Sequence, residues 1–192
     1  MPAGQPLPLL WLLSDARNDA RLEAALAALP PGSGFVFRHY HLAPDVRRAR
    51  FEALAAHARA FRHLVILAGT QAWGSDGHYG TRGAAGLYLA TAHDGAELVA
   101  AAKDRADGVF LSPVFPTTSH PGAATLGIHG FHVLAQQSPV PVIALGGMTA
   151  ARAGHLAWPR WGAIDGLADA EDALTARRGA THKAGGADRG TI

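Results

Sequence analysis

The stretch GVFLSPVFPTTSHPGAATLG, residues 108–127, begins as a continuous apolar run and ends as a loop of hydroxyls, prolines and glycines. Consecutive Val, Phe and Leu side chains are typical of a strand that is buried on both faces, as strands of parallel sheets are. A helical pattern follows the loop. We therefore expect this stretch to form one β–α unit, with its polar loop at the carboxyl end of the strand.

Similar apolar runs, separated by helical patterns or by turns, occur along most of the chain. We expect strands near residues 9–13, 34–42, 63–69, 77–80, 86–90, 108–115, 139–147 and 161–168. We expect helices near residues 18–29, 44–62, 94–103 and 129–137, and one starting at Thr149. Eight strands with helix-length crossovers favour an α/β fold, a single (β/α)8 barrel of the TIM type. Because 192 residues are few for this fold, we expect shortened crossovers between the third and fifth strands.

The composition is that of an ordinary globular protein and excludes several classes. The chain has 17 basic and 15 acidic residues and no basic stripe, so we expect no nucleic-acid partner. The absence of cysteine excludes disulfide scaffolds, cysteine-bound zinc and thiol catalysis. No apolar run approaches the length of a membrane helix, and the apolar start lacks a signal peptide's basic region. We expect a cytoplasmic protein with a barrel domain at residues 1–176 and a disordered tail at 177–192, whose sequence has no apolar periodicity. The sequence does not indicate an oligomeric state.

In a parallel barrel, functional side chains lie at the carboxyl ends of the strands. The residues expected there are Arg38, Tyr40, Thr91, His93, Thr117, Thr118, Ser119, His120, Gly146, Gly147 and Asp165. Hydroxyls, an arginine and glycine N–H groups together suit a phosphate ligand. Two other interpretations stay open, because a Gly-Gly pair also serves a tight turn and Ser or Thr also cap turns.

Arg38 lies in an otherwise apolar run, so we expect a salt bridge or an anionic ligand to pair with it. Strand alternation places Val36, Arg38 and Tyr40 on one face and His39 and His41 on the other. The two histidines have the spacing of metal ligands, but no third ligand is apparent, so we expect packing histidines and no metal site formed by the protein.

Other mechanisms are less well supported by the sequence. Asp15 and Asp76 are candidate catalytic acids, although each could equally cap a loop or a helix. The two lysines, Lys103 and Lys183, do not lie at strand ends, which excludes a Schiff-base aldolase. A nucleophile elbow of the G-x-S-x-G type is absent.

The segments ADGVFLSPVFPTTSHPGAATLG and PVPVIALGGM, within residues 106–148, resemble the thiamine phosphate synthase/TenI family of (β/α)8 barrels. The similarity is weaker at GSDGHYG (74–80), at Thr91-Ala92-His93 and at the two ends of the barrel. The resemblance implies a transferase that couples hydroxymethylpyrimidine diphosphate to a thiazole phosphate and releases diphosphate. The partners would thus be small phosphorylated heterocycles. The family positions that contact phosphate or diphosphate correspond here to Arg38, Thr91, Thr117, Ser119, His120, Gly147 and Ile164.

The sequence departs from the family at several positions. The family's Gln and Lys around Arg38 are replaced by Val36 and Tyr40, and its Asn-Asp on the third strand by an apolar-glycine run. A second metal-binding Asp has no counterpart, and Asp165 stands where the family has a phosphate-binding Ser. These departures imply that any Mg²⁺ would be held through the substrate diphosphate.

Two alternatives to the transferase remain. A thiazole tautomerase of the TenI type carries a histidine where this chain has Pro113, so His93 or His120 would have to act as acid or base. A barrel that binds a phosphorylated ligand without catalysis is the other alternative. For the transferase, the expected catalytic residues are Arg38, His120 and His93.

Overall fold

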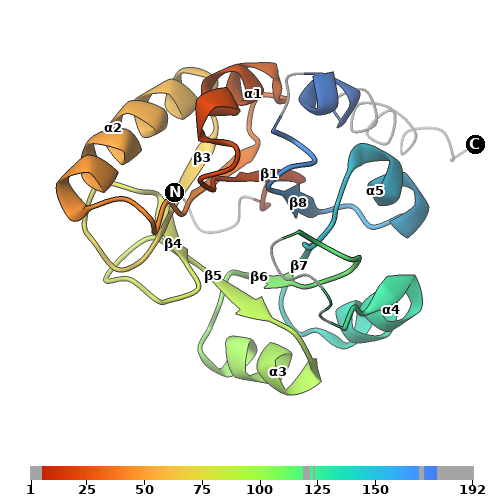
Figure 1. Ribbon diagram of the computed structural model, residues 1–192. Coiled ribbons are helices and arrows are strands. Elements are labelled where there is room, and N and C mark those ends of the chain that lie inside the picture. The colour runs from red at the N-terminus through yellow and green to blue at the C-terminus, as the bar shows by residue number, and fades with distance from the viewer. Residues whose placement is uncertain (1–5, 119–121, 123, 169–170, 177–192) are drawn as a thin grey trace, which may run out of the picture.

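A computed structural model describes residues 6–118, 122, 124–168 and 171–176 of the chain. Eight parallel strands pair in chain order and close into a barrel, with the last strand beside the first (Figure 1). The strands are β1 (Leu10–Leu13), β2 (Gly34–Phe37), β3 (Leu64–Ala68), β4 (Gly77–Tyr79), β5 (Leu87–Ala92), β6 (Gly108–Leu111), β7 (Val142–Ala144) and β8 (Trp161–Ala163). The predicted (β/α)8 architecture is therefore confirmed.

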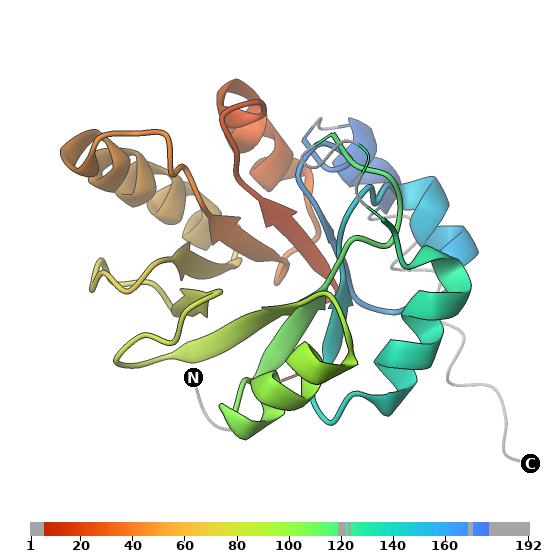
Figure 2. The ribbon, with the colours of Figure 1, turned by 60° about the horizontal axis from the view of Figure 1, so that its bottom comes forward.

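Helices surround the barrel, as Figures 1 and 2 show. They are the 3-10 turn η1 (Asp19–Arg21), α1 (Leu22–Ala28), α2 (Pro44–Ala60), α3 (Gly95–Lys103), α4 (Gly127–Gln137) and α5 (Ala150–Leu156). No helix connects β3 to β4 or β4 to β5, and all residues of those two connections are described. The crossovers between β3 and β5 are thus shortened, as the sequence predicts.

Alternate residues of each strand fill the interior of the barrel. The buried interior side chains are Trp11, Leu13, Val36, Ile66, Leu89, Phe110 and Ile143. The indole of Trp11 packs edge-on against Phe110, with ring centroids 5.6 Å apart. The Trp11 ring occupies the space beside Gly34. A Cβ added to Gly34 would lie 2.1 Å from Trp11 Cε3. The interior is therefore a packed core, and any cavity must lie above it.

The opposite faces of the strands pack against the helices. Phe37 of β2 meets Phe51 of α2, with ring centroids 5.4 Å apart, and Leu54 is buried in the same layer. Burying a side chain of this size contributes about 2 kcal/mol. This layer holds each strand end, and the loop that follows it, at a defined place on the rim.

Four strands, β2, β6, β7 and β8, end three or more residues earlier than the apolar runs predict. β2 ends at Phe37 because His39 adopts a φ of +23°, which turns the chain out of the sheet. β6 ends at Leu111, before Pro113, which has no N–H to donate to a neighbouring strand. Both ends open onto the carboxyl rim of the barrel. The predicted tail, residues 177–192, lies outside the described residues. Among the described helices, none has the length and apolar character needed to cross a membrane.

Candidate functional site

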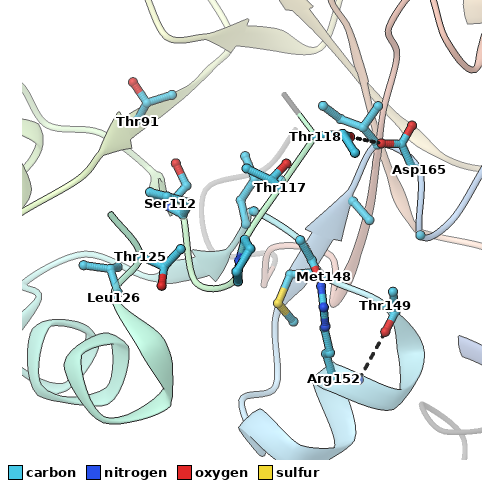
Figure 3. A pocket seen from close by; sticks show the side chains of 18 of the residues that line it. Thr91, Ser112, Thr117, Thr118, Thr125, Leu126, Met148, Thr149, Arg152 and Asp165 are labelled. Atoms are coloured by element: carbon cyan, nitrogen blue, oxygen red, sulfur yellow. Dashed lines mark hydrogen bonds between the residues drawn. The ribbon is translucent and has the colours of Figure 1, made fainter. Parts of the chain in front are cut away.

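A cavity of about 890 Å³ lies at the carboxyl ends of the strands (Figure 3). This volume falls in the range of pockets that bury small organic ligands. Its floor includes Tyr79, Leu145 and Ile164, which also pack against the interior core. The cavity therefore continues the barrel axis, where the sequence predicts the site.

The barrel brings most of the predicted site residues to this single cavity. Those that line it are Arg38, Tyr40, Thr91, His93, Thr117, Thr118, Gly146, Gly147, Ile164 and Asp165. Ser119 and His120 lie outside the described residues. Residues more than 100 positions apart in the sequence thus share one pocket, although their roles stay predictions.

Arg38 lies at the end of β2 and is half-buried at the cavity wall. Its Nε atom is buried and has no hydrogen-bond partner among the described residues. The guanidinium carbon lies 5.8 Å from the ring centroid of Tyr40. An unpaired cationic group at a cavity wall is what an anionic ligand would satisfy.

The two glycines after β7 are required by packing, whatever the ligand. Gly146 and Gly147 have φ angles of +94° and +61°. A Cβ at Gly146 would lie 2.6 Å from Pro113 Cα, and one at Gly147 would lie 2.4 Å from Pro116 O. The tight-turn interpretation therefore holds. The N–H groups of both glycines donate to no described residue, so the turn can also bind an anion.

The carboxylate of Asp165 shares an arginine that sequence reasoning missed, Arg17, with the carboxylate of Asp15. Arg17, in the loop after β1, lies 3.5 Å from Asp165 Oδ2 and donates to Thr118 Oγ1 at 2.7 Å. Thr118 in turn donates to Asp165 Oδ2 at 3.1 Å, as Figure 3 shows. The hydroxyl of Thr118 thus links three loops, and neither of these two hydrogen bonds caps a turn.

Two further cavity residues, Tyr79 and Arg152, were also missed by sequence reasoning. Burial raises the pKa of the Tyr79 phenol to about 12, against the opposing charge of Arg38, so the phenol is a neutral donor at pH 7. Strand alternation in β4 could have identified Tyr79 as an inward residue. Arg152 follows the glycine turn on α5 and donates from Nη1 to Gly147 O at 2.5 Å.

His93 lies on the rim, and its ring is oriented by the β6 strand end. Nδ1 lies 2.7 Å from Ser112 O, and because a carbonyl only accepts, Nδ1 carries the proton. In the neutral ring, Nε2 is then an acceptor.

The remaining candidates do not line the cavity and have structural partners. Asp76 accepts from Val65 N at 2.8 Å, and Asp15 accepts from the main chain and side chain of Arg17. His39 is buried on the outer face of β2, as alternation predicts, between Ser14 and Asp19.

The cavity does not fit a magnesium ion held by the protein. Asp165 is the carboxylate among the described lining residues, and it is paired with Arg17. Nowhere in the described part of the chain do three His, Asp or Glu side chains gather in a way that could hold a metal. Mg²⁺ prefers several oxygen ligands, usually including carboxylates, and this lining does not offer them.

Fold and site together define a (β/α)8 barrel with a cavity at its carboxyl rim, lined by hydroxyl side chains, arginines and a Gly-Gly turn. Residues 86–165 match the family described as thiamine monophosphate synthase. The thiamine-phosphate synthase of Chloroflexus aurantiacus is 37% identical over 64 residues, which are 33% of this chain and 30% of that protein. The putative thiamine-phosphate synthase 2 of Aquifex aeolicus is 43% identical over 49 residues, 26% of each chain. The matched segments therefore span less than a third of these two relatives.

The barrel as a whole resembles a solved structure, the thiamine phosphate pyrophosphorylase from Pyrococcus furiosus. The TM-score is 0.72 at 20% identity, over 92% of this chain and 94% of that one, which supports the fold. The matches to the family and to the two relatives confirm the resemblance of this segment to the thiamine phosphate synthase family, and the structural match shows the shared fold.

Proposed function

We propose that the protein is a thiamine phosphate synthase-like transferase that couples hydroxymethylpyrimidine diphosphate to a thiazole phosphate, in the cytoplasm. The observation that carries this proposal is the buried Nε of Arg38, which has no hydrogen-bond partner among the described residues, in one cavity with Gly146 and Gly147. Two anion-binding features at different strand ends suit two phosphorylated substrates. The cavity volume of about 890 Å³ accommodates two small heterocycles.

In the proposed reaction, the bond between the pyrimidine methylene carbon and the diphosphate oxygen breaks, and its electron pair leaves with diphosphate. The ring nitrogen of the thiazole then supplies a lone pair to the methylene carbon, which forms the new C–N bond. Negative charge grows on the leaving oxygen during this step. A preorganised cation at that oxygen lowers the barrier, and in this proposal Arg38, which lines the cavity, supplies it.

The other cavity residues would orient the substrates. Tyr79 and Thr91 offer neutral donors at the cavity wall, and the turn at Gly147 would take the thiazole phosphate near Arg152. Since the lining does not fit a magnesium ion, any Mg²⁺ would enter with the diphosphate, and the roles above do not depend on it. His93 and His120 remain proposed acid–base residues.

The test is formation of thiamine phosphate by the purified protein from the two substrates. Arg38→Ala should lower the rate about 100-fold, the typical loss when one donor to a developing negative charge is removed. Arg48→Ala is the matched control, because Arg48 is exposed on α2 and pairs with Glu52, away from the cavity. Absence of product from the unmodified protein, together with binding of a thiazole phosphate, would instead support a non-catalytic binding barrel.

A further inference from the structure

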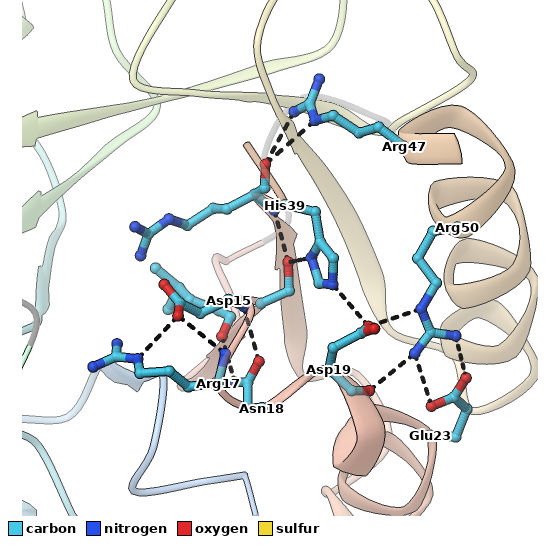
Figure 4. A network of polar contacts seen from close by, with 11 residues as sticks. Asp15, Arg17, Asn18, Asp19, Glu23, His39, Arg47 and Arg50 are labelled. Carbon is cyan, nitrogen blue, oxygen red and sulfur yellow. Dashed lines mark hydrogen bonds and ion pairs between the residues drawn. The ribbon is translucent and has the colours of Figure 1, made fainter. Parts of the chain in front are cut away.

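A chain of three short hydrogen bonds leads away from Arg38 behind the cavity wall. The main-chain N–H of Arg38 donates to Ser14 Oγ at 2.7 Å. Ser14 Oγ lies 2.7 Å from His39 Nδ1, and His39 Nε2 lies 2.7 Å from Asp19 Oδ1 (Figure 4). The chain connects β1, the end of β2 and the η1 turn.

The protons of this chain have one consistent arrangement. The Arg38 amide can only donate and the Asp19 carboxylate only accepts, so His39 Nε2 carries a proton. Burial lowers the pKa of His39, against the opposing effect of Asp19, which favours the neutral ring. Nδ1 is then an acceptor, and the Ser14 hydroxyl donates to it. Every member is satisfied, which is the condition under which a buried polar network gives rigidity.

The far end of the chain is anchored by an ion pair. Arg50 of α2 donates from Nε to Asp19 Oδ1 at 2.8 Å and from Nη2 to Asp19 O at 2.9 Å. Its Nη1 lies 2.5 Å from Glu23 Oε1. Asp19 is therefore fixed both by its side chain and by its main chain.

The carbonyl of Arg38 is held from the opposite side. Arg47 Nη2 donates to Arg38 O at 3.2 Å and to Ala68 O at 2.5 Å. The Arg47 guanidinium is buried beside Phe37 and Trp73, with its carbon 5.7 Å and 5.2 Å from their ring centroids. The main chain of Arg38 is thus clamped at its N–H by Ser14 and at its C=O by Arg47.

The next residue has a backbone conformation that needs such support. His39 has a φ of +23°, a region that residues with a side chain rarely adopt. Its ring is buried and stacks on Phe37, with centroids 4.7 Å apart and an interplanar angle of 5°. A strained backbone conformation next to a ligand-facing residue persists when contacts on several sides hold it in place.

The residue types Ser, His and Asp also occur in nucleophilic triads, but this chain does not fit that role. Ser14 is 0% exposed, and its oxygen already accepts from Arg38 N–H. A nucleophile must reach its substrate, and Ser14 does not.

We propose that Ser14, His39 and Asp19 are positioning residues, which fix the direction in which Arg38 enters the cavity. The proposal rests on the proposed function only in that Arg38 binds the diphosphate group. The residues touch no substrate and act through the main chain of Arg38.

The test measures binding of inorganic diphosphate by calorimetry at pH 7.5. Ser14→Ala and His39→Gln should each weaken binding about tenfold, since each removes a buried hydrogen bond on which the direction of Arg38 depends. His63→Gln is the matched control, because His63 is also a buried histidine with a lowered pKa. His63 lies just before β3, and its Nε2 contacts Leu26 O of α1. The His63→Gln variant should bind diphosphate as the unmodified protein does.

A double variant separates positioning from general destabilisation. In an Arg38→Ala background, Ser14→Ala should cause no further loss of diphosphate affinity, because its effect passes through Arg38. If Ser14→Ala does not fold, His39→Gln is combined with Arg38→Ala instead.

The outcomes distinguish this inference from the proposed function. Unchanged diphosphate affinity in both single variants overturns the inference, as does equal weakening by His63→Gln. Failure of the unmodified protein to bind inorganic diphosphate also overturns it. Failure to form thiamine phosphate, with diphosphate binding and its dependence on Ser14 intact, overturns only the proposed function.

Discussion

Charge balance at single residues decides whether the cavity can take a phosphate. Asp165 lines the cavity, and a lone carboxylate there would repel a phosphorylated ligand. Arg17, 3.5 Å away, offsets this charge, and the Thr118 hydroxyl bridges the two side chains. The pair is partly exposed, so water screens both the repulsion and its compensation.

Replacement of Asp165 should strengthen phosphate binding. Asp165→Ser removes a negative charge from the cavity lining, so we expect the affinity for inorganic phosphate to rise about threefold. Calorimetric titration at low salt measures this change. Asp45→Ser, at the exposed start of α2, is the control and should have no effect. If the Asp165→Ser variant binds phosphate no more tightly than the unmodified protein does, the anion binds away from β8.

At the scale of elements, glycines determine how closely strands and side chains approach. Gly34 on β2 faces the barrel interior, where the Trp11 ring of β1 occupies the position of a Cβ. Gly154 on α5 has open space around it. The same substitution at the two sites therefore tests packing at one and helix propensity at the other.

Alanine should have opposite effects at these two glycines. Gly34→Ala forces the Trp11 indole to move in a filled core and should lower the free energy of unfolding by about 3 kcal/mol. Gly154→Ala should raise it by up to about 1 kcal/mol, because alanine favours the helix. Urea unfolding measures both. Similar stability of the Gly34→Ala variant and the unmodified protein would contradict the interior placement of Trp11.

At the scale of the whole molecule, buried histidines couple stability to pH. Burial lowers the pKa values of His39 and His63 below the ordinary value of 6.5. The groups that face the His39 ring are Asp19 of η1, Arg50 of α2 and His41 after β2. The unfolded chain therefore binds protons at a higher pH than the folded chain does.

The free energy of unfolding should accordingly fall as the pH drops below about 6.5, the value at which the unfolded histidines protonate. The loss continues until the pH reaches the lower pKa values of the folded state. Urea unfolding at a series of pH values from 8 to 5 measures the slope. The free energy of unfolding of the double variant His39→Gln/His63→Gln should change less with pH over this range. A stability that rises on acidification there would contradict the neutral, buried state of both rings.

Strand alternation was sufficient to predict from the sequence that some side chains face the cavity. Arg38 follows Val36 on the inward face of its strand, so the sequence places it at the cavity wall. Alternation could likewise have indicated Tyr79 in the short strand β4. Arg17 could not be found in this way, because it meets Thr118 and Asp165 only when three distant loops gather at the rim.

The sequence by itself determined the barrel, because continuous apolar runs at helix-length spacing are stable only as parallel strands covered on both sides. It also determined which strand ends carry polar residues. Only the tertiary structure decided how those residues are paired: the Arg17–Asp165 ion pair, the clamped main chain of Arg38 and the buried Ser14–His39–Asp19 chain. The reason is physical. Hydrogen bonds and ion pairs depend on distances of about 3 Å between residues far apart in sequence, and closure of the barrel sets those distances.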